Sequence, residues 1–292
     1  MRRTPRRQFL QTLGQGAGGL LLAPSLLAAL PAASPVRKYA HDRVLLGHTG
    51  IRASRLALGT GTHGSGHASD QTRMGMEHFH DHFQHAFEQG INFWDTADQY
   101  GSHDFLRAML QRIPRREVVI LTKTHASTGP EMEADLDRFC REIGTDYLDI
   151  VLLHCMLNAA WPQEKAGAMQ VLEQAREKGR IRAHGVSCHN FGAMQVASRL
   201  PWVQVELQRI NPLGVPMDAE PPKVIALLRE MKAAGQAVVG MKIFAEGRLS
   251  HQPDLALGHA IRLDCLDAFT IGMMGPSQLD DVAHRLPLLS VA

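Results

Sequence analysis

Four polar side chains could together reduce a carbonyl group: those of Asp95, Tyr100, Lys123 and His154. A carbonyl that is reduced accepts a hydride at its carbon and a proton at its oxygen, so the site needs a proton donor. Tyrosine, with an ordinary pKa of about 10, matches neutral pH poorly, and a neighbouring lysine cation lowers that pKa. A carboxylate can hold the lysine charged, and a histidine can orient the substrate oxygen through a hydrogen bond. These residue types therefore point to a proton-donating site.

Each of these residues also has an ordinary structural explanation. Asp95 could cap the next segment, Lys123 could form an ion pair at a barrel mouth, and His154 could be a core histidine with satisfied hydrogen bonds. All of them, however, lie at or shortly after the end of a short run of apolar residues. Their joint occurrence at corresponding strand ends favours the catalytic interpretation.

Short apolar runs recur about every thirty residues and alternate with helical patterns. They are rich in Val, Ile and Leu, as strands buried on both faces are. Eight strands are expected, at Leu56–Gly59, Ile91–Asp95, Val118–Lys123, Leu148–Leu153, Ala183–Ser187, Val203–Leu207, Ala237–Met241 and Ala268–Ile271. Such alternation in one domain predicts an α/β fold, a (β/α)8 TIM barrel, over a doubly wound sheet. A short N-terminal β-hairpin, Arg43–Leu46 with Ile51–Ala53, is expected to plug the lower end of the barrel.

The carboxyl ends of barrel strands face one mouth, so strands two, three and four would bring Asp95, Lys123 and His154 together. Tyr100 would follow in the loop after strand two. A glycine motif after the first strand, Gly59-x-Gly61-x-x-Gly64, also matches a dinucleotide-binding fingerprint. The next helical pattern begins about nine residues later, so no helix N-terminus stands ready for a pyrophosphate. We therefore interpret this segment as a loop at the barrel mouth.

Residues 1–34 show the order of features of an export signal. Arg6-Arg7-Gln8-Phe9-Leu10 matches the twin-arginine pattern, an address read by machinery that exports folded proteins. The apolar stretch Leu13–Leu30 is interrupted by glycines and Pro24, so stable membrane insertion is not expected. The sequence thus predicts a periplasmic protein that engages the twin-arginine export machinery, with one barrel domain at residues 35–292.

Composition argues against several other classes of protein. The formal net charge is +2, part of it in the export segment, so no basic face for nucleic acid is indicated. No C-x-x-C pair occurs among the cysteines, which are expected to be buried small hydrophobic residues: Cys140, Cys155, Cys188 and Cys265. Three histidines at i, i+4 and i+7 could bind a metal, but a solvated polar face is favoured and no metal is predicted: His78, His82 and His85.

The segment Asp95-Thr96-Ala97-Asp98-Gln99-Tyr100-Gly101 resembles the D-T-A-x-x-Y-G signature of the aldo-keto reductases. Three later segments resemble further conserved motifs of that family and occur in the same order: Thr122-Lys123, Leu153-His154 and Gly185-Val186-Ser187. The resemblance covers essentially the whole chain after the export segment. It implies a (β/α)8 barrel that binds NADP(H), in preference to NAD(H), across its mouth. It also implies hydride transfer to a small aldehyde or ketone substrate.

The resemblance also implies roles for individual residues. Tyr100 would be the proton donor, with Lys123 and Asp95 tuning it, and His154 would orient the carbonyl. Six residues would bind the cofactor: Ser187, Gln204 and Asn190 at the nicotinamide amide, and Lys242, Ser277 and Gln278 at the phosphates and the adenosine ribose.

The chain departs from the family pattern in three places. Members usually stack an aromatic ring on the nicotinamide from strand six, whereas Gln204–Leu207 has none. Many carry a basic residue after strand eight for the 2′-phosphate of NADP, whereas Gly272–Gln278 has none. The long C-terminal loop that often covers the substrate pocket is not expected, so the site should be open and shallow.

Two other functions stay open at this point. A metal-dependent hydrolase on the same fold would use histidines on strand one, which His63 and His67 could imitate. Its later ligands are missing, since strands five and six end in Ser187 and Leu207, with His189 the one nearby candidate. A non-catalytic barrel that binds nucleotide or serves as a regulatory subunit is the second alternative.

Overall fold

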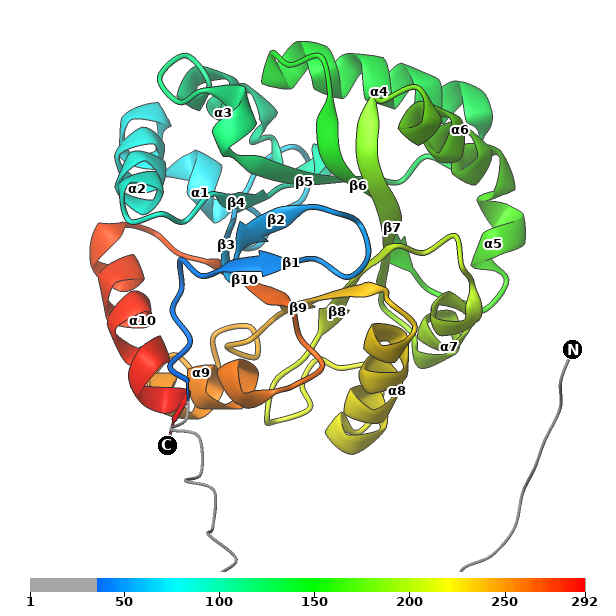
Figure 1. Ribbon diagram of the computed structural model, residues 1–292. Coiled ribbons are helices and arrows are strands. Elements are labelled where there is room, and N and C mark those ends of the chain that lie inside the picture. The colour runs from blue at the N-terminus through cyan, green and yellow to red at the C-terminus, as the bar shows by residue number, and fades with distance from the viewer. Residues whose placement is uncertain (1–35, 292) are drawn as a thin grey trace, which may run out of the picture. The chain divides into compact units, whose positions relative to one another are not determined.

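Eight parallel strands form a closed barrel in the computed structural model, which describes residues 36–291 (Figure 1). The predicted export segment lies outside the described residues. The strands are neighbours in the order β10-β3-β4-β5-β6-β7-β8-β9. Their bounds are β3 Leu56–Gly59, β4 Phe93–Asp95, β5 Val119–Thr124, β6 Leu148–Met156, β7 Ile181–Cys188, β8 Val205–Arg209, β9 Ala237–Met241 and β10 Ala268–Gly272. The predicted (β/α)8 barrel and its eight strands are confirmed.

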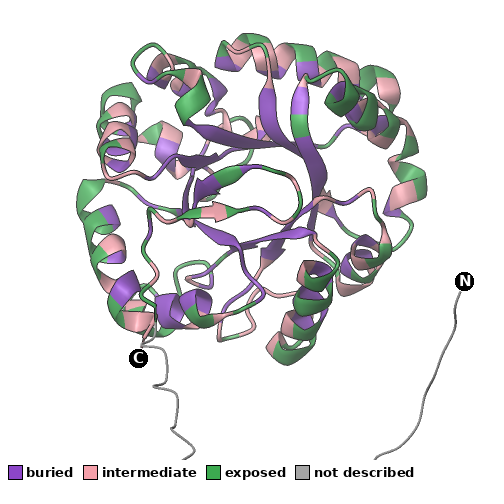
Figure 2. Ribbon diagram, viewed as in Figure 1, coloured by how far each residue is buried: buried purple, intermediate pink, exposed green. Residues whose placement is uncertain are grey.

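Alternation along each strand divides the core into two layers. One set of side chains fills the barrel interior, among them Phe93, Leu121 and Leu152. The alternate set, such as Trp94 and Ile120, packs outward against the helices. Figure 2 shows the barrel strands buried over most of their length and the helices with buried and exposed residues side by side. The barrel is therefore a packed core, and only the ends of its strands can carry a site.

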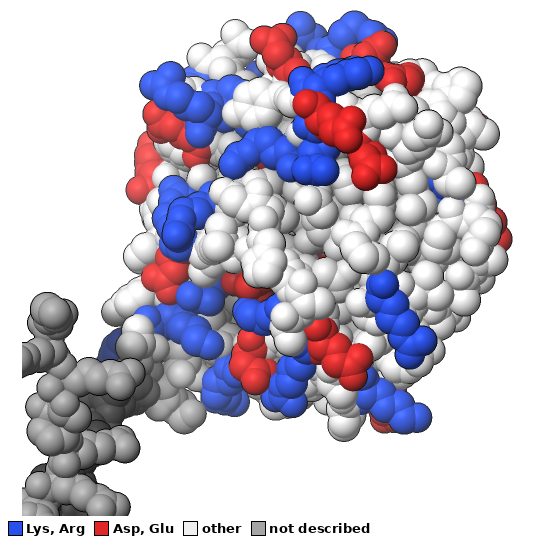
Figure 3. Space-filling model, turned by 45° about the vertical axis from the view of Figure 1, so that its right-hand side comes forward, with Lys and Arg blue, Asp and Glu red and all other residues white. Residues whose placement is uncertain are grey.

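The helices surround the barrel (Figure 1), and their buried apolar residues belong to the cluster that packs against the outside of the strands. On the face drawn in Figure 3, basic and acidic side chains lie near one another, with uncharged surface between the groups. In α4, Thr128 and Glu131 form a capping box at the start, and Gly144 ends the helix with φ 73°. The helix bounds are α1 Asp70–Arg73, α2 Met76–Glu88, α3 His103–Met109, α4 Gly129–Ile143, α5 Trp161–Glu164, α6 Ala166–Glu177, α7 Phe191–Arg199, α8 Pro221–Ala233, α9 Pro253–Arg262 and α10 Pro276–Leu289. Two 3-10 turns are η1 Asp98–Tyr100 and η2 Arg115–Glu117. None of the helices within residues 36–291 is long and apolar enough to cross a membrane.

Helix α2 corrects the expectation of a solvated histidine face. Phe79 and Phe83 stack at 4.2 Å between ring centroids, as the apolar stripe predicted. His82, however, is fully buried beside them. His85 instead contacts Asp280 at 2.7 Å. The buried stripe of α2 is wider than the apolar residues alone indicate, so the three histidines do not share one exposed face.

The hairpin covers the amino ends of the strands. It consists of β1 Arg43–Leu45 and β2 Arg52–Ser54, paired antiparallel. Leu46, Ile51 and Ala53 belong to the same buried cluster as the residues inside the barrel. The expected plug is thus confirmed, and the opposite end of the barrel is left as the open mouth.

A buried carboxylate stabilises the amino end of β6. Asp149 is fully buried and accepts hydrogen bonds from Arg115 Nη2 at 2.7 Å, Arg182 Nη1 at 2.7 Å and the amide of Ile120 at 2.9 Å. Removing the carboxylate leaves the buried amide of Ile120 without its acceptor, and the part-exposed arginines lose their partner. We therefore expect Asp149→Ala to lower the free energy of unfolding by about 1–3 kcal/mol in urea titrations.

The matched control for this prediction is an exposed ion pair. Asp264 accepts from Arg229 Nε at 2.9 Å, and both side chains are largely exposed. Asp264→Ala should change the free energy of unfolding by less than about 1 kcal/mol. Equal losses in the two variants would show that the buried carboxylate has no special role.

Candidate active site

Three neighbouring strands end in the predicted polar residues. Asp95 ends β4, Lys123 lies near the end of β5, and His154 lies near the end of β6. Each is two positions beyond a residue of the barrel interior, namely Phe93, Leu121 and Leu152, so the period of two turns it inward. All three are buried. The sequence prediction that these side chains meet at one mouth agrees with this placement.

Lys123 is the centre of the arrangement. Its Nζ donates to Asp95 Oδ1 at 2.5 Å and to the carbonyl of Thr96 at 2.7 Å. The same Nζ lies 5.0 Å from the ring centroid of Tyr100. Burial alone would lower the pKa of Lys123, but Asp95 and Tyr100 outweigh it and the pKa is raised. The ammonium group therefore keeps its charge at neutral pH.

Tyr100 ends the η1 turn and faces both Lys123 and His154. Its ring meets the His154 ring edge-on, with 5.9 Å between centroids. Burial raises the pKa of Tyr100 by more than the charge of Lys123 lowers it, so the pKa lies above its ordinary value. This corrects the expectation of a net lowering by lysine. The phenol consequently holds its proton at neutral pH and is available as a donor.

His154 is a neutral imidazole. Burial, followed by the charge of Lys123, lowers the pKa of His154 to about 2. Its ring stacks on His125 at 4.7 Å between centroids, and His125 Nε2 contacts Gln99 Oε1 at 2.9 Å. Within the described part of the chain, His154 Nδ1 is buried without a hydrogen-bond partner. A neutral histidine carries one N–H, so it can orient a carbonyl oxygen but supplies no charge.

Strained backbone concentrates on the loops at this mouth. Six residues other than glycine have positive φ in the described chain, and they follow β3, lie in β6 or follow β9: His63, His67, Cys155, Lys242, Ala245 and Glu246. The left-handed region costs such residues about 1 kcal/mol or more. Strain of this kind collects at binding and catalytic sites, which supports this face as the functional one.

Most of the predicted cofactor residues lie on the same face. Ser187, buried on β7, accepts a hydrogen bond from the amide of Cys155 at 2.9 Å. Asn190 caps α7 by accepting from the amide of Ala193 at 3.1 Å. Lys242, just beyond β9, pairs with Glu246 at 3.1 Å. These side chains thus have structural partners already, and their reach toward a cofactor stays a prediction.

Ser277 and Gln278 occupy the first turn of α10, which follows β10. Gln278 Oε1 accepts from the amide of Met274 at 2.8 Å. Gly275 at the helix start provides no side-chain cap. The amides of this first turn are therefore open to an anionic group. That geometry fits the adenosine-phosphate end of a nicotinamide dinucleotide.

The sequence prediction placed Gln204 at the nicotinamide amide, and this placement is wrong. It precedes β8, where its Oε1 accepts from the amide of His184 at 3.3 Å and its carbonyl accepts from Ala237 at 2.8 Å. Ala237 begins β9, so Gln204 lies at the amino end of the barrel, opposite the mouth. It cannot hold the nicotinamide amide from there.

Arg209 is the residue that β8 brings to the mouth, and the sequence prediction missed it. It continues the inward row of Val205 and Leu207. Its guanidinium pairs with the fully buried carboxylate of Asp218. The expected strand, Val203–Leu207, ended two residues early. Extending the inward alternation by one step would have found Arg209.

A cluster of possible metal ligands lies beside this region but is already neutralised. Oxygen and nitrogen atoms of Asp98, His103 and Glu142 lie within 4.8 Å of one another, the one such group in the described chain. Arg138 donates to Asp98 at 2.6 Å and to Glu142 at 3.1 Å. A guanidinium among the carboxylates explains the cluster without a metal.

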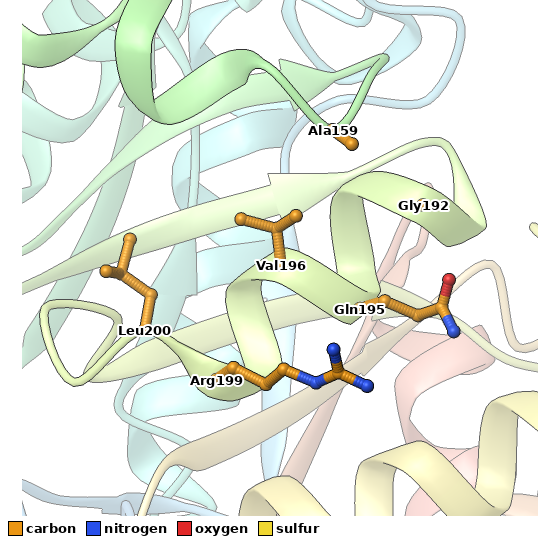
Figure 4. A pocket seen from close by; sticks show the side chains of 6 residues that line it. All are labelled: Ala159, Gly192, Gln195, Val196, Arg199 and Leu200. Atoms are coloured by element: carbon orange, nitrogen blue, oxygen red, sulfur yellow. The ribbon is translucent and has the colours of Figure 1, made fainter.

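The surface holds a depression of about 420 Å³ along α7 (Figure 4). It is lined by Ala159, Gly192, Gln195, Val196, Arg199 and Leu200. None of the four polar residues of the mouth lines it. The depression belongs to the helix layer and is separate from the polar residues of the barrel mouth.

A model of the aldo/keto reductase family matches residues 55–259 of the chain. The match includes β3 to β9 and all four polar residues of the mouth. The protein belongs to the aldo/keto reductase family.

Curated relatives of this family are distant. The chain is similar to aldo-keto reductase AMT2 of Alternaria alternata, with 23% identity over 248 residues, or 71% of this chain and 65% of the relative. It is also similar to the NADH-specific methylglyoxal reductase of Escherichia coli, with 26% identity over 188 residues, or 56% of this chain and 57% of the relative. The chain thus spans about three fifths of the length of these relatives.

Solved structures of the family share the fold. Aldo-keto reductase AKR11C1 from Bacillus halodurans, in its holo form, superposes with a TM-score of 0.67 at 18% identity and covers 86% of this chain and 91% of its own. Aldo-keto reductase AKR2E5 complexed with NADPH gives a TM-score of 0.64 at 17% identity, with 87% and 88% covered. At such identities the likeness establishes the (β/α)8 fold alone.

Proposed function

We propose that this protein reduces an aldehyde or ketone with hydride from a reduced nicotinamide dinucleotide, with Tyr100 as the proton donor. One observation carries the proposal. Nζ of the buried Lys123 donates to Asp95 Oδ1 at 2.5 Å and lies 5.0 Å from the ring centroid of Tyr100. Family membership supports the same reaction class and disfavours the metal-dependent hydrolase.

The residues of the mouth have separate roles in the proposed carbonyl reduction. The neutral His154 donates an N–H to the substrate oxygen and orients the carbonyl. The reduced nicotinamide, when bound, supplies the hydride to the carbonyl carbon. Tyr100 gives its phenolic proton to the oxygen, and Lys123 stabilises the phenolate that this leaves. Asp95 holds Lys123 in place, which keeps the cation from drifting into solvent.

The cofactor is NADP(H) in this proposal. The 2′-phosphate would have no basic side chain after β10, because Gly272–Gln278 contains none. The uncapped first turn of α10 offers backbone amides and the positive end of a helix dipole instead. Parallel titrations with NADPH and NADH should give the lower Kd for NADPH. Equal or tighter binding of NADH would refute this preference.

The reaction is tested by a nucleotide titration followed by a screen of small aldehydes and ketones. We expect the reduced cofactor to be consumed with carbonyl substrates, and a chelator to leave the rate unchanged. Nucleotide binding without turnover on any carbonyl would favour the regulatory barrel. Hydrolytic activity lost on chelation would favour the metal-dependent hydrolase.

Residues 1–34 direct folded export to the periplasm in this proposal, with residues 35–292 as the passenger. The support is the Arg6-Arg7 pair followed by an apolar stretch and small residues. Replacing both arginines by lysine should retain the protein in the cytoplasm in cell fractionation. Protein recovered from the periplasm should carry bound nucleotide, since folded export allows loading beforehand. Nucleotide-free periplasmic protein with weak affinity would oppose this loading.

A further inference from the structure

The glycine motif that resembled a dinucleotide fingerprint lies against the ring of Tyr100. A Cβ atom on Gly61 would stand 2.5 Å from Cζ and 2.7 Å from Cδ2 of Tyr100. A Cβ atom on Gly64 would stand 2.8 Å from Cε1 of the same ring. Carbon atoms in contact are about 3.5–4.0 Å apart, so neither position accepts a side chain with the ring where it is.

Space, and not backbone conformation, requires glycine at these two positions. The glycines with positive φ include Gly66 and Gly101 but neither Gly61 nor Gly64. Alanine could therefore adopt the backbone conformation at both positions. At Gly61 the three nearest atoms to a methyl group all belong to the ring of Tyr100, and at Gly64 the two nearest do, followed by the carbonyl oxygen of Gly61 at 3.1 Å.

The loop that carries these glycines, residues 60–69, is held to the Tyr100 segment by several contacts. Gln99 Nε2 donates to the carbonyl of Gly64 at 3.2 Å. His67 Nδ1 contacts the carbonyl of Asp98 at 3.1 Å. A Cβ on Gly101 would come within 2.6 Å of the backbone carbon of His67. The loop is thus a fixed wall and not a free flap.

We propose that Gly61 and Gly64 are positioning residues that set the place of the Tyr100 phenol. Gly61 and Gly64 lie against the ring, and Lys123 and His154 are close to the same ring. The glycine pattern is therefore a template for the catalytic side chain and not a phosphate cradle. This inference rests on the proposed role of Tyr100 as proton donor.

The kinetic test compares three alanine variants. Gly61→Ala and Gly64→Ala should each lower kcat by about 10²-fold, because displacing a reacting group by about 1 Å costs that much. The Kd of the cofactor should stay within about twofold. Gly179→Ala, in the turn before β7 at the amino end of the barrel, is the matched control: its φ is 74°, so alanine is strained there, but no atom lies within 4 Å of its Cβ. It should lose thermal stability and keep kcat.

A second measurement tests the contact without reference to activity. In a double-mutant cycle, Gly61→Ala should lower the Tm of the native protein but have little effect in a Tyr100→Ala background, where the ring is gone. Equal Tm losses in both backgrounds would overturn the inference, as would unchanged kcat in both glycine variants. If the cycle shows coupling but Tyr100→Phe keeps full turnover, the contact between Gly61 and the ring is confirmed and the role of Tyr100 as proton donor is refuted.

Discussion

Tyr100→Phe should lower kcat by about 10²–10⁴-fold and leave the Kd of the cofactor within about twofold. The change removes one hydroxyl group and keeps the ring. The contacts of the ring with the Gly61–Gly64 loop, Lys123 and His154 are therefore retained. What is lost is the proton that must reach the substrate oxygen as hydride arrives at the carbon. Steady-state kinetics with the best carbonyl substrate, together with a cofactor titration, measure both quantities.

Tyr147→Phe is the matched control for this substitution. Tyr147 lies just before β6, at the amino end of the barrel, under the guanidinium of Arg115 at 4.1 Å. Loss of its hydroxyl should leave kcat unchanged. If Tyr100→Phe turns over substrate at the rate of the native protein, Tyr100 is not the proton donor. A weakened Kd with unchanged kcat would instead place its hydroxyl in cofactor binding.

The barrel and the polar residues of its mouth follow from sequence because both depend on short-range patterns. Runs of Val, Ile and Leu bounded by helical segments define strands buried on two faces. A residue at the carboxyl end of such a strand must lie at the mouth of the barrel. Asp95, Lys123 and His154 could be brought together by this argument alone.

The limits of a strand follow less directly from sequence than its existence does. The limits of β8 decide which of its residues belong to the site. The strand runs from Val205 to Arg209, so Gln204 precedes it at the amino end and Arg209 lies at the mouth. The inward row of Val203, Val205 and Leu207 is apolar, and its next member, Arg209, is charged, so the apolar pattern alone ends the strand at Leu207. Pairing with β7 and β9 extends the strand to Arg209, which is a tertiary effect.

The electrostatics of the mouth also depend on burial, which sequence shows poorly. The charge of Lys123 was expected to dominate the pKa of Tyr100, but removal of the phenol from water has the larger effect. The same limit applies to His82, which a polar-face interpretation exposes and the packing of α2 buries. Both errors concern polar groups whose neighbours come from other parts of the chain.

Acidification from pH 7.5 to pH 5 should destabilise this protein by several kcal/mol, because neutral histidines are buried in it. Burial is the first cause that lowers the pKa of His82 and of His184 to about 4. Neither side chain has appreciable exposure. The unfolded chain takes up protons on these residues below about pH 6.5, whereas the folded chain does so only near pH 4. Between about pH 6.5 and pH 4 the unfolded state therefore binds more protons than the folded state, so the free energy of unfolding falls as the pH falls.

Each fully buried histidine should contribute about 2 kcal/mol to this loss by pH 5, from the difference between the two pKa values. His82→Leu and His184→Phe remove the titrating groups, and phenylalanine can retain the stacking of His184 on Trp202 at 4.4 Å. Urea unfolding at pH 7.5, 6 and 5 should show a smaller pH slope in each variant, whereas the exposed His251→Gln should keep the native slope. Most carboxylates titrate below about pH 4.5 and contribute little in this range. The exception is Glu206, because burial raises the pKa of this carboxyl well above its ordinary value. Its contribution opposes that of the histidines, but it is common to all the proteins compared and so does not affect the differences between their slopes. Identical slopes in all four proteins would mean that the buried rings take up protons in the folded state as readily as in the unfolded one.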